Sequence, residues 1–258
     1  MSFFNRILAG IGIGSARLDT LLERSSYFPG EEIRGVVRIK GGQLAQRIDR
    51  IYLSVMTYYV REVNDHKVNT STSIAKIKVS EPMEIQPNEE RDVPFAFYLP
   101  GSTPLTLGRS TVWIKTTADI EAAVDPTDED RIEVKPHPFM DTIFAAIGQI
   151  GFRLRNAETV YAPRLGGSMP YVQEFEWIPT GSYRGRLDEV ETVFLNVSDS
   201  GVDLLLQIDR RAQNVFSLFA EAMDMDESFV RLSIRDHDLR QGPAHVAAIL
   251  NQTISRYA

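Results

Sequence analysis

The chain has 258 residues, 43% of them hydrophobic and 24% charged, with a net charge of −7. This composition is typical of a globular protein, and the length allows two domains of ordinary size. The absence of cysteine excludes disulfides, thiolate metal sites and cysteine nucleophiles. The acidic balance, without a dense Lys/Arg cluster, argues against a nucleic-acid partner.

No apolar run approaches the roughly 18 residues of a membrane-spanning helix, so no transmembrane segment is predicted. The apolar stretch 7–14 is short, glycine-rich and weakly basic at its start, which disfavours a secretory signal peptide. A short helix at the N-terminus, with Phe3, Phe4 and Ile7 on one side, is the preferred interpretation.

Alternation of apolar and polar residues with period two dominates the first half and predicts half-buried strands. After a first strand at 17–23, proline at the second position and glycine at the third position of Phe28-Pro29-Gly30-Glu31 predict a type II turn. Pro94 cannot donate to a strand ladder, so its strand is expected at a sheet edge or a bulge. The expected strands continue at 33–40, 51–60, 75–80, 93–99, 112–122 and 132–134. This spacing is typical of a β-sandwich.

The pattern changes at the stiff segment 135–138, which is followed by apolar residues at helical spacing and a stop at Gly151. Strands then resume, and an amphipathic helix is expected at 243–257. The expected later elements are strands at 152–155, 171–178, 187–197, 202–208 and 230–234, and a short helix at 209–223. Without strand–helix–strand alternation, a parallel α/β fold is disfavoured. The predicted fold class is mainly β, with two tandem antiparallel β-sandwiches. The predicted domains are 1–135, a linker with a short helix at 136–151, and 152–258 with its C-terminal helix.

Two short motifs could indicate a ligand site. Gly10-Ile11-Gly12-Ile13-Gly14 resembles a nucleotide loop, but the strand–loop–helix context of a dinucleotide site is missing, so a flexible lead-in is preferred. Asp236, His237 and Asp238 could ligate a metal, but the histidines show no i, i+4 pairing. A polar turn after the last strand is the preferred interpretation of these three residues.

Two acidic groups were considered for catalysis or calcium binding. The run 125–130 lacks the central glycine and spaced ligands of an EF-hand loop, so a solvated hairpin turn is predicted. Glu189 and Glu191 share a strand face, as paired glycosidase carboxylates would, but acid–base catalysis also needs a pocket that separates their pKa values. An exposed strand is predicted for this pair. No catalytic, cofactor-binding or metal-binding residue is assigned.

Three segments in order resemble an arrestin-like N-domain: a proline–glycine turn entering a strand at 27–35, the strand Val93–Pro100 with its F-x-F-x-L-P pattern, and the long strand 113–124. Within that superfamily the chain resembles the SpoOM sporulation-control family over nearly its whole length. That resemblance rests on the stretches 12–20, 173–176, 187–191 and 207–211.

The resemblance implies two arrestin-like, immunoglobulin-like sandwich domains, a bacterial cytoplasmic location and a regulatory role in sporulation. It supplies no catalytic or cofactor residues. Arrestins use a buried charged cluster between domains as a trigger; its members cannot be assigned to positions here, so that switch is not carried over.

We therefore expect a non-catalytic regulatory or scaffold protein, not an enzyme, that needs no cofactor. Its expected partners are other proteins, which could add a strand to a sheet edge, or a second copy in a homodimer through the same edges. Two alternatives stay open: a metal-dependent hydrolase using Asp236, His237 and Asp238, and a carbohydrate-binding sandwich that exposes tyrosines such as Tyr52, Tyr58 and Tyr98. The C-terminal helix either caps its own domain or docks on a partner.

Overall fold

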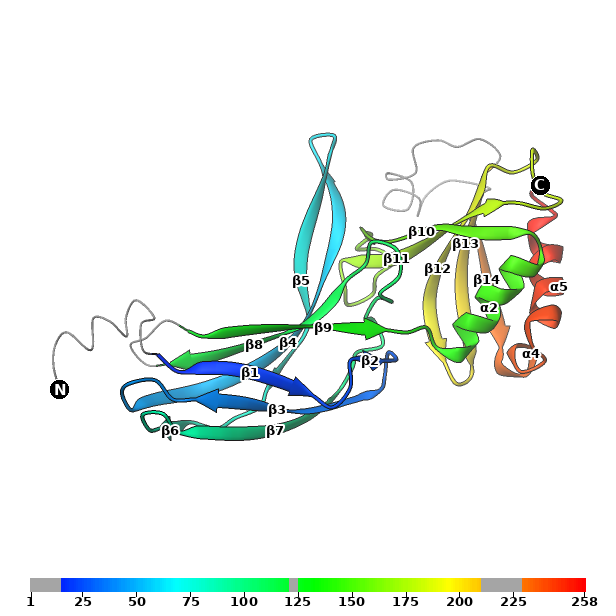
Figure 1. Cartoon of the computed structure of the whole chain (residues 1–258). Helices are drawn as coiled ribbons and strands as arrows, with labels where there is room; N and C mark the ends of the chain where they lie inside the picture. The colour runs from blue at the N-terminus through cyan, green and yellow to red at the C-terminus, as the bar shows by residue number, and fades with distance from the viewer. Residues whose placement is uncertain (1–14, 121–124, 210–228) are drawn as a thin grey trace. The chain divides into compact units, whose positions relative to one another are not determined.

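The computed structural model describes residues 15–120, 125–209 and 229–258. Within them the chain is mainly β, with its helices in the second half, so the predicted fold class is confirmed (Figure 1). Two compact units are distinguished: one comprises 1–57, 72–103 and 112–134, and the other comprises 58–71, 104–111 and 135–258. The helices expected at the N-terminus and after Asp209, and the glycine-rich stretch, lie outside the described residues.

The first unit is built from antiparallel strands in two sheets. A three-stranded sheet has the order β1-β3-β7, while β4 pairs with β8, β8 with β9, and β5 and β6 with β4. The short β2 adds to β9 in parallel. These strands are β1 (Arg17–Leu22), β2 (Ser26–Tyr27), β3 (Glu32–Lys40), β4 (Gln46–Val63), β5 (His66–Lys78), β6 (Met83–Ile85), β7 (Glu90–Tyr98), β8 (Val112–Ile120) and β9 (Thr127–Val134).

The alternation seen in the sequence explains the core of this unit. On β3, Val37 and Ile39 are fully buried, and β4 contributes Ile51, Leu53 and Val55. Burying such a side chain stabilises the fold by about 1.5–3 kcal/mol. β7 ends its sheet, which confirms the edge position expected for the strand that holds Pro94.

The second unit contains one antiparallel sheet of five strands in chain order, β10 to β14. Its elements are α2 (Pro138–Gln149), β10 (Phe152–Tyr161), β11 (Tyr171–Pro179), β12 (Glu189–Ser198), β13 (Gly201–Asp209), β14 (Phe229–Arg235), α4 (Asp236–Leu239) and α5 (Pro243–Ile254). The last part of β4 also belongs here, because Val60 pairs in parallel with Val160 of β10.

Helix α2 begins at Pro138, where the missing N–H costs nothing, and the His137 ring accepts a hydrogen bond from Phe139 N. Its Phe144 ring packs against Phe175, Trp177 and Phe194 of the sheet. The predicted helix after residue 138 is thereby confirmed, and it covers one face of the second unit's sheet.

Helix α5 packs on α2, with Val246 and Leu250 fully buried. Tyr183 of the same unit donates a hydrogen bond to the Asn251 side chain over 2.7 Å. Of the two roles considered for the C-terminal helix, the structure therefore shows packing on its own unit.

The segment 104–111 is held against β10 and β11 by reciprocal hydrogen bonds. Leu105 N donates to the Gln173 amide oxygen, and the Gln173 amide nitrogen donates to Leu105 O, each over 2.8 Å. Gly108 adopts φ +60°, and a Cβ there would lie 2.4 Å from Ala157 O, so only glycine fits. This close approach places the next residue, Arg109, beside the second unit's sheet.

Candidate functional site

The motif Asp236-His237-Asp238 forms the short helix α4 rather than the predicted polar turn. The Asp238 carboxylate contacts two imidazoles, His245 Nε2 at 2.9 Å and His237 Nε2 at 3.2 Å. Within the described ranges, no group of three His, Asp or Glu side chains is arranged to hold a metal ion. The structure thus places a further histidine, His245, beside the motif, which the sequence did not indicate. Within the described ranges these residues are not arranged as a metal site.

The acidic run 125–130 is only partly a solvated turn, so that prediction was wrong for two of its members. Asp128 accepts a hydrogen bond from Thr20 N over 2.7 Å, and Asp130 is half-buried beside it. Burial, together with the neighbouring Asp128, raises the pKa of Asp130 to about 6. These two carboxyl groups face inward because β9 begins at Thr127, which places alternate acidic residues on the covered side of the strand.

The tyrosines considered for carbohydrate binding have unlike surroundings. Tyr98 is 71% exposed and Tyr58 is 45% exposed. Tyr52 is half-buried, with the Lys76 ammonium 4.1 Å from its ring centroid. Tyr52 and Tyr98 belong to different sheets of the first unit, so they do not form a row on one surface.

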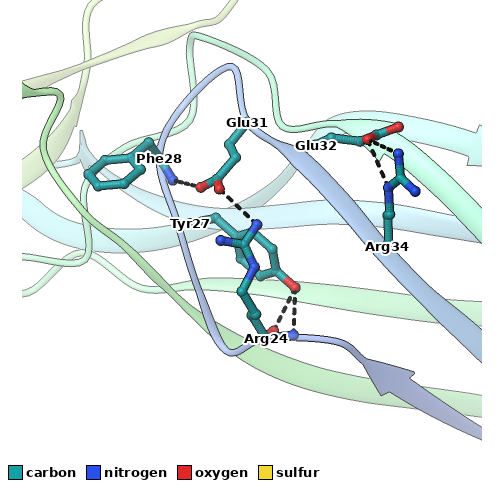
Figure 2. A network of polar contacts seen from close by, with 6 residues as sticks. All are labelled: Arg24, Tyr27, Phe28, Glu31, Glu32 and Arg34. Carbon is teal, nitrogen blue, oxygen red and sulfur yellow. Dashed lines mark hydrogen bonds and ion pairs between the residues drawn. The ribbon is translucent and has the colours of Figure 1, made fainter.

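The proline–glycine turn at 28–31 is a closed polar network (Figure 2). Glu31 N donates to Phe28 O over 3.0 Å and Gly30 has φ +86°, which confirms the predicted turn. The Glu31 carboxylate accepts hydrogen bonds from Phe28 N and from the Arg24 guanidinium, which lower its pKa. Tyr27, which is buried, donates to Arg24 O over 2.6 Å. Because these groups satisfy one another, the network shapes the turn and offers little to a ligand.

The prediction of an exposed strand for Glu189 and Glu191 was wrong, because they are only 3% and 5% exposed. They lie on the sheet face opposite to the one that α2 covers. Register places Glu191 directly across from Glu176, and Glu174 directly across from Glu158, on that same face. We call these five residues of β10, β11 and β12 the carboxylate face.

Arg155 is the central cation of the carboxylate face. A β-bulge between Leu154 and Asn156 displaces Arg155 from the regular ladder, and bulges re-aim side chains in this way. Its guanidinium forms ion pairs with Glu176 and, at 2.8 Å, with Glu189. A second cation, Arg109, lies 3.5 Å from Glu158.

Glu174 forms neither an ion pair nor a side-chain hydrogen bond among the residues that the structure describes. Burial and the facing Glu158 carboxylate raise its pKa to about 8, and Lys67 partly offsets that shift. Glu158 is also covered, with 6% of the residue exposed. Because Glu158, Glu189 and Glu191 are almost fully covered, the carboxylate face offers a substrate little access.

The alternation that predicted a shared face for Glu189 and Glu191 also occurs on the neighbouring strand. Glutamates alternate with apolar residues in both Gln173-Glu174-Phe175-Glu176 and Glu189-Val190-Glu191. Alternation shows that the glutamates share a face, but it cannot show that this face is covered.

β7 and β14 are both edge strands, but they differ in how their outer sides are protected. β7 carries Pro94, and its exposed acids are already paired across the strand: Asp92 with Arg38 at 2.9 Å and Glu90 with Lys40 at 3.1 Å. Proline and paired charges are common protections of a sheet edge. β14 has no proline, and its Arg231 and Arg235 form no ion pair within the described ranges.

Comparison with known proteins agrees with this architecture. The family model described as SpoOM protein matches residues 4–212. The sporulation-control protein Spo0M of Bacillus subtilis (strain 168) is 39% identical over 259 residues, which covers all of both chains. This chain belongs to the SpoOM family.

The crystal structure of Spo0M, sporulation control protein, from Bacillus subtilis superposes with a TM-score of 0.90 at 38% identity. The match covers 95% of this chain and 100% of that one. The resemblance to the SpoOM family inferred from the sequence is thus confirmed. Among the described residues of this family member, no helix is long and apolar enough to cross a membrane.

Proposed function

We propose that this SpoOM-family chain is a non-catalytic regulatory protein of sporulation that acts in the cytoplasm by binding other proteins. The observation that carries the proposal is a contrast within the second unit. Three of the five glutamates of the carboxylate face are almost fully covered, whereas β14 pairs with only one strand, β13, among the described residues. The name of the Bacillus subtilis relative, a sporulation-control protein, supports the regulatory role.

Complementation tests the regulatory part of this proposal. A Bacillus subtilis strain that lacks its own Spo0M would express this chain, and heat-resistant spores would be counted. We expect the chain to restore sporulation, and His237→Ala to restore it equally, because the His237 side chain is 70% exposed and its one described contact is Asp238. Loss of function in His237→Ala, together with metal in the purified wild type, would favour a metal-dependent hydrolase instead.

Binding measurements test the second part of the proposal. Proteins captured by the purified full chain from sporulating cells would be purified and titrated against it by calorimetry. Saturable binding with whole-number stoichiometry is expected for at least one of them. Restored sporulation without any such partner would overturn the protein-binding proposal and leave the regulatory role intact.

A further inference from the structure

The side of β14 that pairs with no described strand presents a regular set of backbone groups. Asp236 N donates to Ser200 O over 3.1 Å, and the register pairs Ile234 with Val202. In an antiparallel pair, hydrogen-bonded and non-bonded residues alternate. The N–H and C=O groups of the even-numbered residues of β14 are therefore directed to β13, and those of Arg231, Ser233 and Arg235 point away from it.

The side chains of these same three residues are exposed. Ser233 donates its hydroxyl to Asp203 of β13 over 2.6 Å. The two arginines form no hydrogen bond or ion pair within the described chain, and they stand four residues apart, which is about 13 Å along a strand. Their face of the sheet is the one that carries Leu205, since Arg231 lies directly across from it.

The other face of β14 is apolar, with Val230 and Leu232 half-buried and Ile234 buried. A strand added to this edge would therefore meet cationic groups on one face and aliphatic groups on the other. The complementary segment is extended and alternates apolar residues with polar ones, and it carries acidic residues at positions i and i+4.

A second copy of this chain fits this edge poorly. Two β14 strands paired in antiparallel would bring two further arginines onto the face that already holds Arg231 and Arg235. Like charges on neighbouring strands repel each other. Charge complementarity therefore favours a different, acidic partner.

We infer that the β14 edge, the outer side of Arg231–Arg235, binds an extended acidic segment of another protein as a sixth strand of the second unit's sheet. This inference rests on the proposed function and names the chemistry of the partner. Main-chain hydrogen bonds supply the affinity in such β-strand addition, and side chains at alternate positions supply the specificity.

A labelled peptide tests the charge requirement. The probe is Val-Glu-Val-Thr-Val-Glu-Val with blocked ends, and binding to the full chain is followed by fluorescence anisotropy. We expect saturable binding that weakens with salt, and a loss of about tenfold or more in Arg231→Glu/Arg235→Glu. The matched control is Arg153→Glu/Arg164→Glu, which changes the net charge equally at two exposed arginines of the same unit and keeps wild-type affinity.

A second pair of variants tests the backbone requirement. Ser233→Pro removes an outward N–H, whereas Ser233→Ala keeps that N–H and loses the same hydroxyl bond to Asp203. We expect Ser233→Ala to bind like the wild type and Ser233→Pro to lose binding. Circular dichroism should show that both variants are folded. Hydrogen exchange in the wild type should slow at the amides of Arg231, Ser233 and Arg235 when peptide is added.

Equal affinity of wild type and Arg231→Glu/Arg235→Glu, or no saturation by about 1 mM peptide, which corresponds to roughly −4 kcal/mol, would overturn the inference. Dimerisation of the free chain that Ser233→Pro abolishes would also overturn it, because a second copy would then be the occupant. A purified cellular partner that binds the wild type and Arg231→Glu/Arg235→Glu with equal affinity would refute binding at the β14 edge and leave the proposed function standing. If no cellular partner binds the wild type at all, the protein-binding part of the proposed function fails.

Discussion

The three-stranded sheet of the first unit and the five-stranded sheet of the second unit carry their charges in opposite ways. On β3 and β7, cations and anions face solvent in one-to-one pairs, such as Arg38 with Asp92, both nearly half exposed. On β10, β11 and β12, five glutamates share one face, two of them pair with Arg155, and three of the five are almost fully covered. Exposed pairs contribute little to stability, whereas covered charges are costly unless they are compensated. Substitutions that remove a charge should therefore change the free energy of unfolding more in the second unit than in the first.

The largest effect is expected from Arg155→Met, which leaves Glu176 and Glu189 without their described cation. Breaking a buried ion pair costs about 3–5 kcal/mol; because half of the Arg155 side chain is exposed, we expect a loss of about 2–3 kcal/mol. Urea unfolding at pH 7 measures it. Arg153→Met is the matched control, since Arg153 is exposed and forms no ion pair within the described chain. An equal loss in both variants would show that Arg155 contributes only packing.

Glu174→Gln should stabilise the protein, and increasingly so as the pH rises. The folded-state pKa of Glu174, about 8, lies above the ordinary glutamate value of 4.5, so the folded state holds this proton more tightly. Stability is therefore lost as the pH rises through the folded-state pKa. Between pH 5 and pH 8 the variant should gain about 1–2 kcal/mol over the wild type. Parallel curves of melting temperature against pH would contradict this assignment.

A smaller effect of the same sign is expected in the first unit from Asp130→Asn. The pKa of Asp130 is raised from 3.8 to about 6, so its ionisation destabilises the fold between about pH 4 and pH 6. The variant should gain about 1 kcal/mol at pH 7 relative to pH 4. Glu129→Gln, an exposed neighbour on the same strand, should leave the pH profile unchanged.

The smallest effect is expected from Arg38→Ala on the surface of the first unit. Its two hydrogen bonds to Asp92, each 2.9 Å, lie at an exposed site. We expect a loss of unfolding free energy close to the limit of measurement at low salt, and a smaller one still in 0.5 M salt. A loss as large as that of Arg155→Met would remove the distinction between the two sheets.

Periodicity was sufficient to predict most strands, the proline–glycine turn and helix α2, because each depends on residues close together in the sequence. Pro94 could be placed on an edge strand for the same reason, since its missing N–H is a local property. Burial of a strand face is not local. Glu189 and Glu191 alternate with apolar residues just as exposed glutamates do, and only the chain packed over them decides that they are covered.

The candidate sites show the same limit. The sequence was sufficient to identify the motif that contains Asp238, but the contact of Asp238 with His245 depends on how α5 follows α4. In the sequence, Arg153 and Arg155 alternate with apolar residues, and a bulge between Leu154 and Asn156 turns Arg155 toward Glu176 and Glu189. An irregularity of one residue in a strand has no distinct signature in the sequence.

The second unit is assembled from segments that lie far apart in the sequence, and this sets an order of events during synthesis. Val60 pairs with Val160, and Arg109 pairs with Glu158, so two early stretches must wait for partners made much later. At ribosomal rates of about 5–20 residues per second, the delay for Val60 is roughly 5–20 s. During that interval, nascent 58–71 lacks its native neighbours and is open to chaperones or to mispairing. A fragment that starts at residue 135 would never receive these stretches, however well its own five strands pair.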